Sequence, residues 1–373
     1  MTEKNIPCAY ILKDGVRVFL TSQEIRFRKG IWNFNEAVIS LVDKEKSLID
    51  FFKAVARQLI NTQEVNVDII AESQAIKQPA LNQYIEVLDG LKQQQFLYLA
   101  NKNEATRIVS ALLGGNLSGF EEYVSGARPV IFISDNDYAK NAALLMAKEI
   151  KLPLDILDEH AVRELSKVDL TTRTEAIEYR EALAKFEKVI SSYCCVVACV
   201  SEPNLTMLRN LNRVLVKAEK PLILGMLDGP FSTVLSTHAT QSGCFECYEQ
   251  RMLARLEDTM VYHKYIRDRN QSGIDSSFGG VNGPWFSPPL HVLTGSVISE
   301  AFLYSTLSML RLAGRVISTY LPLLEIQAQD ILRVPYCPAC GSISTAEMDE
   351  MYTSSKQIIS DMLANVELQE GDS

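Results

Sequence analysis

Apolar and polar side chains alternate along the first forty residues of the chain. Residues 16–20 and 24–28 place every second side chain on an apolar face, which is the pattern of a strand buried on one side. A turn follows, and the alternation resumes over residues 30–35. We therefore predict three short strands in this part of the chain.

Helical spacing then replaces the alternation. Apolar residues recur every three or four positions over residues 48–59 and again over residues 81–91, which predicts two helices that each bury one face. Strands followed by helices within a short chain segment are typical of small α+β domains. Residues 1–100 are therefore predicted to form a winged-helix-like domain.

From residue 129 onward, short apolar runs alternate with helical stripes. This order predicts a doubly wound, mainly parallel sheet in an α/β domain over residues 128–373, joined to the first domain by a linker of residues 101–127. The predicted strands are residues 129–134, 152–157, 194–200 and 221–227, and the predicted helices are residues 138–150, 174–191 and 205–219.

The composition is that of a folded protein rather than a disordered one. The chain has 373 residues, of which 47% are hydrophobic and 22% are charged. A chain of this length is longer than a single hydrophobic core usually serves, which agrees with two domains. The net charge of −9 and the lack of a basic stripe argue against nucleic acid as the main partner.

The longest apolar stretch does not have the pattern of a membrane span. Residues 290–312 include His291, Glu300 and Arg311, whereas a spanning helix needs about 20 residues with almost no charge. We predict a buried helix there and no membrane partner. The polar first residues do not resemble a signal peptide, so we expect a cytoplasmic protein.

The eight cysteines divide into two kinds. Cys194, Cys195 and Cys199 lie in an apolar run, where a reduced cysteine acts as a small hydrophobic residue, and Cys8 stands alone. The other four form two Cys-x-x-Cys pairs: Cys244 with Cys247, and Cys337 with Cys340. In a reducing compartment such pairs indicate metal or redox chemistry.

Two Cys-x-x-Cys pairs can supply the four thiolates of a tetrahedral zinc site. Because four thiolates leave no open position for water, we predict a structural zinc ion rather than a catalytic metal. The alternative is four unrelated thiols or a redox-active pair.

The loop after the first strand of the α/β domain lacks the glycines that bind phosphate. Residues 134–138 read Ser-Asp-Asn-Asp-Tyr, so two carboxylates stand where the anionic phosphates of a nucleotide would dock at a helix N-terminus. We expect no ATP binding in the usual mode of this fold. Ser134 or Asp135 is predicted to cap the following helix.

Several residues of the second half form a pattern shared with a known superfamily: Pro203, Asn204, Arg209, Asn212, residues 220–223, Gly225, residues 243–247, Arg251 and residues 337–340. This pattern resembles the E1-like (ThiF/MccB-type) adenylating superfamily, in which two Cys pairs bind structural zinc. The late Tyr-Cys-Pro-Ala-Cys-Gly is similar to the "C proteins" of thiazole/oxazole-modified microcin pathways of the streptolysin S type. Residues 27–37 resemble the winged-helix precursor-recognition element of the same proteins.

The resemblance implies a non-catalytic role in making a ribosomal peptide bacteriocin or toxin. Such C proteins bind the leader of a precursor peptide and deliver it to a YcaO-type cyclodehydratase, which uses ATP to form azoline rings. The resemblance also implies a homodimer or a complex with that enzyme. E1 enzymes carry a Gly-rich loop and a magnesium-binding Asp, whereas this chain has residues 134–138 and Glu202 at those places.

Two other functions remain open from the sequence. One is a divergent E1-like enzyme that itself activates a carboxylate of a precursor peptide by adenylation. The other is a sulfur-carrier or ubiquitin-like activating protein, which usually needs a nucleophilic cysteine that this chain does not clearly offer.

Leader binding is expected to occur by strand addition. An extended leader would add to an edge strand at residues 30–35, and side chains of the helix at residues 81–91 would supply specificity. The residues predicted to bind the leader are Arg28, Ile31, Trp32, Phe34, Tyr84, Ile85 and Leu88. The alternative is that the apolar members of this set belong to the hydrophobic core.

Overall fold

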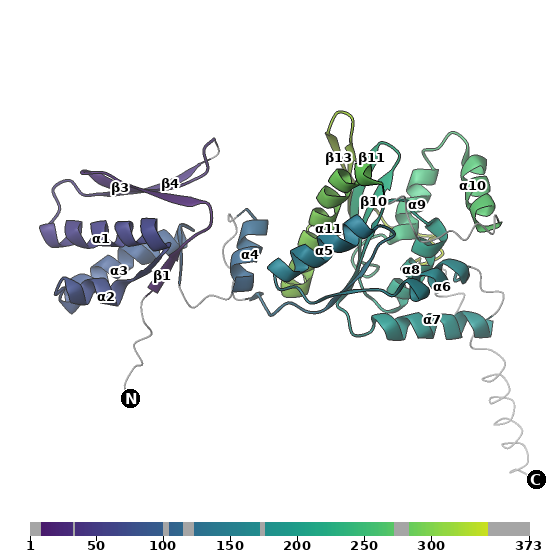
Figure 1. Cartoon of the computed structure of the whole chain (residues 1–373), viewed down its shortest axis with the longest axis horizontal. Helices are drawn as coiled ribbons and strands as arrows, with labels where there is room; N and C mark the ends of the chain where they lie inside the picture. Colours follow the sequence, from purple (N-terminus) through teal and green to yellow (C-terminus); the bar gives the residue numbers. More distant parts are fainter. Residues whose placement is uncertain are drawn as a thin grey trace, which may run out of the picture. The chain divides into compact units, whose positions relative to one another are not determined.

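The chain folds as two compact units, Met1–Ser125 and Gly126–Ser373. The structure is a computed structural model that describes residues 9–32, 34–99, 104–114, 123–171, 176–271 and 283–341. Figure 1 shows the helices and strands of both units.

The first unit combines two small antiparallel sheets with a set of helices. One sheet has the strand order β2-β3-β4 and the other has the order β5-β1-β6. The elements are β1 (Ala9–Leu12), β2 (Val16–Leu20), β3 (Glu24–Lys29), β4 (Asn35–Ser40), α1 (Lys46–Thr62), β5 (Glu64–Asn66), α2 (Val67–Ser73), α3 (Gln78–Gln93), β6 (Leu97–Leu99) and α4 (Glu104–Leu112).

The core of this unit lies beneath the β2-β3-β4 sheet. Ile25 and Phe27 of β3 point inward and share one buried cluster with Phe51, Phe52 and Leu59 of α1. Side chains of a strand alternate between its two faces, so the residues that alternate with Ile25 and Phe27 on β3 face outward. The sequence-predicted strands 16–20 and 24–28 and both predicted helices are present. The α+β composition is therefore confirmed, while the winged-helix comparison stays a prediction.

The strand predicted at residues 30–35 is wrong. Gly30 has a φ of +79° and ends β3, because a left-handed backbone conformation suits glycine and interrupts a strand. Ile31 and Trp32 follow in a bend, with 74% and 92% of their surfaces exposed. The third strand starts only at Asn35, where Ala37 and Ile39 resume the inward-facing positions.

The second unit is built on a seven-stranded sheet within the described residues, in the order β13-β12-β11-β10-β9-β7-β8. Its elements are β7 (Val130–Ile133), α5 (Asp137–Glu149), β8 (Leu154–Ile156), α6 (Glu159–Lys167), α7 (Ala176–Ile190), β9 (Cys195–Val200), α8 (Leu205–Lys217), β10 (Leu222–Asp228), β11 (Phe231–Thr237), α9 (Phe245–Leu253), α10 (Thr259–Gln271), a short 3-10 turn η2 (Pro284–Phe286), α11 (Ser287–Leu307), β12 (Arg315–Tyr320) and β13 (Glu325–Asp330).

The strands of this sheet are of two kinds. Strands β7, β8, β9 and β10 run parallel, as the alternation of strands and helices predicted. Strands β11, β12 and β13 continue the sheet in antiparallel hairpins. The sequence-based prediction missed these three strands because they lack a long apolar run; β13 is almost entirely exposed.

Helices cover both faces of the sheet (Figure 1). Helices α6, α7 and α8 pack on one face through a buried cluster that includes Ile131, Val196 and Leu211. Helices α5 and α11 contact each other, and α11 lies across β9, β10 and β11. Its approach to β10 requires Gly225, since a Cβ there would lie 2.8 Å from Cγ of Leu293. An α/β fold with helices on both faces is thus confirmed.

The apolar stretch at residues 290–312 is largely the buried helix α11, as predicted. Among the helices of the described ranges, none combines the length and the apolar character that crossing a membrane requires.

Candidate functional site

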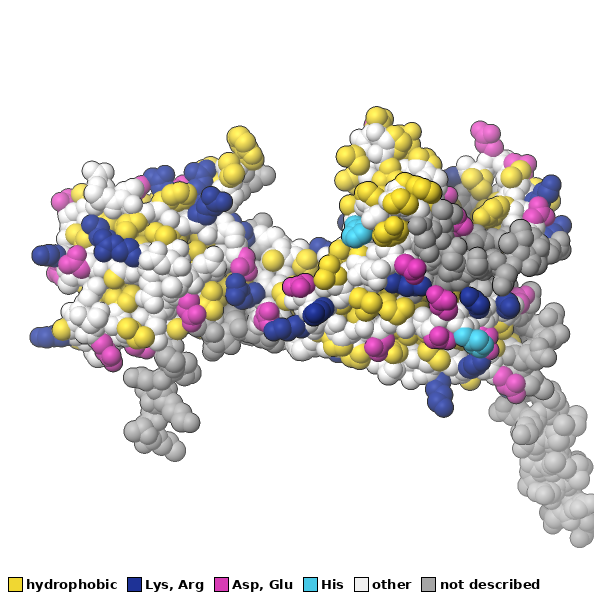
Figure 2. All heavy atoms as spheres, in the orientation of Figure 1, with side chains coloured by type: hydrophobic (Ala, Val, Ile, Leu, Met, Phe, Trp, Pro, Cys, Tyr) yellow, Lys and Arg dark blue, Asp and Glu magenta, His cyan; other side chains and the backbone are white. Residues whose placement is uncertain are grey.

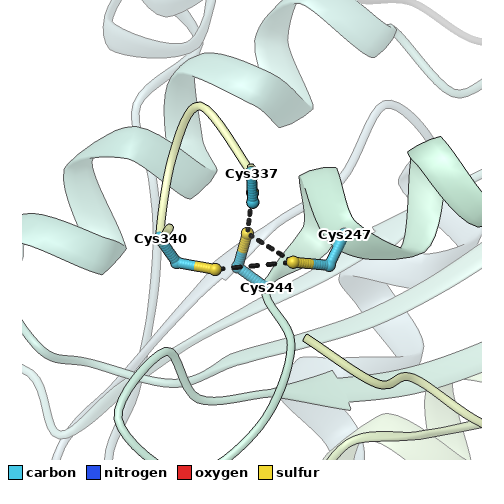
Figure 3. A group of neighbouring side chains, drawn as sticks. All are labelled: Cys244, Cys247, Cys337 and Cys340. Carbon is cyan, nitrogen blue, oxygen red and sulfur yellow. Dashed lines mark hydrogen bonds between the residues drawn. The ribbon is translucent and has the colours of Figure 1, made fainter. Parts of the chain in front are cut away.

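The four paired cysteines meet in one cluster of the second unit (Figure 3). Their Sγ atoms all lie within 4.8 Å of one another. Neighbouring Sγ atoms are 3.6 Å apart between Cys244 and Cys337 and 3.4 Å apart between Cys247 and Cys340. A tetrahedral zinc ion with Zn–S bonds of about 2.3 Å would place its sulfur atoms about 3.8 Å apart. The cluster could therefore hold a structural metal ion, and its all-thiolate donor set fits zinc.

Two distant segments supply these ligands. Cys244 immediately precedes α9 and Cys247 lies in its first turn, while Cys337 and Cys340 lie in the turn after β13. That turn closes at Gly341, whose N–H donates to the carbonyl of Cys337 at 2.9 Å. A Cβ at Gly341 would lie 2.5 Å from the same oxygen, so only glycine fits there. A metal ion would thus link α9 to the segment that follows the sheet.

Backbone and side-chain N–H groups surround the sulfur atoms. Nδ2 of Asn212 lies 3.5 Å from Sγ of Cys244, and the N–H of Val334 donates to Sγ of Cys247 at 3.3 Å. Hydrogen bonds of this kind orient metal ligands and stabilise the thiolate. Hydrogen bonding from the thiol of Cys244, and from those of Cys337 and Cys340, lowers the pKa of Cys247.

A buried ion pair holds the helix beside the cluster in place. Arg213 of α8 makes a two-pronged contact with Glu246 of α9, with N–O distances of 2.6 and 2.7 Å, and also donates to the carbonyl of Pro338. Both charged side chains are about 5% exposed. Asn212 donates to the same carboxylate at 3.1 Å. Arg213 therefore ties α8, α9 and the second cysteine turn together.

The loop after β7 is held by hydrogen bonds to one of its own side chains, Asp135. Asp135 is 5% exposed, and its carboxylate accepts from the backbone N–H groups of Ser201 and Glu202 at 2.7 and 2.8 Å. The hydroxyl of Ser201 adds a third hydrogen bond at 3.1 Å. Burial raises the pKa of Asp135 against the effect of these bonds. The backbone N–H groups that follow β9 therefore donate to the Asp135 carboxylate.

The helix cap in this loop differs from the prediction. The side chain of Asn136 accepts from the N–H of Tyr138 at 2.9 Å, so Asn136 rather than Ser134 or Asp135 caps α5. The neighbouring residues are not free to cap, because Asp135 turns toward β9 and Ser134 bonds to the backbone of Asn136.

Replacing Asp135 by alanine should destabilise the second unit. The change leaves two buried donors of Ser201 and one partly buried donor of Glu202 without an acceptor, at a cost of about 3 kcal/mol in the free energy of unfolding. Denaturant titration of the full chain measures this cost. Asp137→Ala is the matched control, because Asp137 has a side chain that is 66% exposed and its surface ion pair contributes under about 1 kcal/mol. Equal effects of the two changes would contradict a structural role for Asp135.

The seven residues predicted to bind a leader do not form one groove. Tyr84 and Leu88 of α3 lie in the core beneath the β2-β3-β4 sheet, with 4% and 0% of their surfaces exposed, and Ile85 is half-buried against the same core. Arg28 alternates with the inward-facing Phe27 and therefore lies on the opposite, outer face of β3. The burial of Tyr84 and Leu88 agrees with the alternative that these two residues belong to the core.

The other predicted residues gather at the tip of the β3–β4 hairpin. The guanidinium of Arg28 lies over the ring of Phe34, 4.1 Å from its centroid, and donates to the carbonyl of Ile31 at 3.2 Å. Ile31, Trp32 and Phe34 are all more than half exposed. Figure 2 shows basic and exposed hydrophobic side chains side by side over this hairpin.

Strand β4 is an edge strand with backbone groups directed outward. The N–H of Leu41 donates to the carbonyl of Gln23, and β3 and β4 keep one register throughout. Because bonded and non-bonded pairs alternate in an antiparallel ladder, the backbone groups of Glu36, Val38 and Ser40 point away from β3. Within the described part of the chain, no further strand pairs with this edge. The sequence-based prediction missed these residues because it placed the strand too early.

Comparisons with known proteins reveal a shared fold at low sequence identity. A heterocyclase in complex with substrate and cofactor has a TM-score of 0.57 at 13% identity, and the heterocyclase TruD has a TM-score of 0.55 at 13% identity. These matches cover 90% and 91% of this chain but only 40% and 44% of the heterocyclase chains. The chain therefore spans less than half the length of these two proteins.

A smaller protein is matched over its whole length. The microcin C7 biosynthetic enzyme MccB, in complex with N-formylated MccA, has a TM-score of 0.51 at 16% identity, and the match covers 89% of this chain and 100% of that one. No family model matches the sequence. A search of curated proteins finds no similar sequence either. The likeness at this identity shows the fold, which is that of heterocyclases and MccB.

Proposed function

We propose that this chain binds the leader of a ribosomally made precursor peptide and presents the peptide to a YcaO-type, ATP-dependent cyclodehydratase. The β4 edge, with which no strand of the described residues pairs, carries the proposal. Its outward backbone groups at Glu36, Val38 and Ser40 can pair with an extended peptide, and main-chain hydrogen bonds of this kind give affinity without a matching sequence. The fold shared with two heterocyclases and with MccB supports a role in peptide modification.

Two apolar side chains of β4 itself, Ala37 and Ile39, can supply contacts for the leader. Ala37 and Ile39 of β4 and Ile85 of α3 are half-buried against the same core, so each keeps an exposed part. Of the three α3 residues predicted to bind a leader, Ile85 keeps an exposed part, whereas Tyr84 and Leu88 are buried. In the second unit, a zinc ion at the four cysteines would be structural, since the cluster is closed by four thiolates.

The strand-addition mechanism is tested with a proline substitution. Val38→Pro removes an outward N–H and leaves the β3–β4 ladder bonds in place, because Val38 belongs to a non-bonded pair. We expect Val38→Pro in the full chain to bind a fluorescein-labelled leader from a candidate precursor peptide about tenfold more weakly than the unchanged chain does in fluorescence polarisation.

Val38→Thr is the matched control, since it keeps the N–H and the β-branched shape. Its affinity for the leader should equal that of the unchanged chain. If Val38→Pro bound the leader as tightly as Val38→Thr, strand addition at β4 would be refuted.

The second candidate function is adenylation of the precursor by this chain. A hollow of about 330 Å³ at the carboxyl ends of β9 and β10, lined in part by Pro203, Met226, Asp228 and Tyr248, favours it, because α/β sheets bind ligands at that end. Against it, Asp135 occupies the backbone amides after β9. ATP–pyrophosphate exchange with the precursor present separates the two functions. Robust exchange by this chain alone would establish the enzyme.

A further inference from the structure

Two arginines face each other across β2 and β3 on the outer surface of the sheet. Arg17 is the direct cross-strand partner of Arg28, and both side chains lie on the face opposite the core. Like charges at directly opposite positions destabilise a sheet. In the described ranges of the chain, neither arginine forms an ion pair with a carboxylate. Two arginines therefore occupy directly opposite positions without a carboxylate partner among the described residues, although the Arg28 guanidinium also lies over the Phe34 ring and donates to the carbonyl of Ile31.

A third arginine on the same face, Arg26, forms ion pairs with carboxylates. Arg26 pairs with Glu24 and with Glu36, the latter at 2.9 Å. Carboxylates of this unit thus neutralise Arg26, whereas the described residues offer none to Arg17 and Arg28. An acidic group from outside the chain would remove the repulsion between the two arginines.

Apolar side chains and a hollow surround the two charges. A hollow of about 790 Å³ on this face is lined by Arg17, Arg26 and Arg28 together with Phe19 and Ile31. Phe19 is 48% exposed and Ile31 is 74% exposed. Arginine and aromatic residues are enriched in protein interfaces. The chemistry of the hollow suits a carboxylate next to an apolar side chain.

A leader on the β4 edge would not reach this hollow. Strands in a sheet are about 4.8 Å apart, so a strand added beside β4 would lie about 10 Å from β3 and about 14 Å from β2. The hollow is centred on β2 and β3. It therefore remains open when the edge is occupied, and its occupant is a separate segment.

We propose that the outer face of the β2-β3-β4 sheet is a docking surface for an acidic segment of a partner protein. A carboxylate of that segment binds between Arg17 and Arg28, and an adjacent apolar side chain packs on Phe19 and Ile31. This surface includes Arg28 and Ile31 from the set first predicted to bind a leader, but it lies on β2 and β3, away from the backbone groups of the β4 edge, so both can be occupied at once.

A random dodecapeptide library displayed on phage tests the proposal, because it offers acidic and apolar side chains in many orders. Panning on the immobilised full chain should enrich peptides with Asp or Glu beside Phe, Leu or Ile. The test variant is Arg17→Glu, which replaces the repulsion with an opposite-charge pair to Arg28 and should keep or raise the melting temperature. A measured melting temperature at or above that of the unchanged chain would show that loss of peptide selection by this variant does not come from unfolding.

Arg57→Glu is the matched control, because it makes the same charge change at an exposed position of α1. It should select the same peptides as the unchanged chain, and Arg17→Glu should bind them about tenfold more weakly. Enrichment without acidic residues, or equal binding by Arg17→Glu, would overturn the proposal. Val38→Pro should bind the selected peptides as tightly as the unchanged chain does. A failure of leader binding at β4 can therefore be told apart from a failure of this docking surface.

Discussion

Replacing Cys337 by serine is expected to remove zinc and to destabilise the second unit strongly. The change takes away one of four thiolates that join α9 to the turn after β13. Loss of a structural metal site is among the largest single-residue effects, about 5 kcal/mol. For a unit of this size, the melting temperature should fall by about 10–20 °C.

Metal analysis and calorimetry of the purified full chain measure both effects. The unchanged chain should contain one zinc ion, and Cys337→Ser should contain less. Cys194→Ser is the matched control, because Cys194 lies outside the cluster at the start of β9 and is partly exposed. It should keep the zinc and melt near the original temperature. Equal zinc content in the two variants would show that Cys337 is not a ligand of the metal.

Replacing Arg213 by methionine is expected to cost about 4 kcal/mol in the free energy of unfolding. The change leaves the buried carboxylate of Glu246 without its cation, and breaking a buried pair by removing one partner is far more harmful than removing both. The double variant Arg213→Met with Glu246→Leu should therefore be more stable than Arg213→Met alone. Chemical denaturation at neutral pH gives this comparison.

The stability loss caused by Arg213→Met should depend on pH. Burial raises the pKa of Glu246, and Arg213 is the main group that opposes this rise. A carboxyl whose folded-state pKa is raised stabilises the fold when protonated and loses that contribution as the pH rises through the folded pKa. The stability difference between the unchanged chain and Arg213→Met should thus shrink as the pH falls from neutral toward the ordinary pKa of Glu. A constant difference across that range would contradict the explanation.

The regular elements were predictable wherever a single pattern was strong. The buried run that became β9 and the helical stripe that became α8 were placed within a few residues, because each has one apolar signature and nearby boundaries. The first unit shows the limit. Exposed Ile31 and Trp32 continue an apolar alternation past Gly30, and only the left-handed turn there shows that the strand has ended.

The contacts between side chains were harder to predict from the sequence than the helices and strands. The stripe of Tyr84, Ile85 and Leu88 predicted an apolar face of α3, but not whether that face meets the core or a ligand. The role of Asp135 was likewise hidden, since its three hydrogen-bond donors lie at Ser201 and Glu202, directly after another strand.

The sequence by itself determined the α/β alternation, the two cysteine pairs and the lack of a glycine-rich phosphate loop, because each is a local pattern of residue types. Only the tertiary structure decided that the four thiols converge, that Asp135 fills the amides after β9, and that Arg17 faces Arg28. These facts depend on strand register and on contacts between distant segments, which no local spacing records.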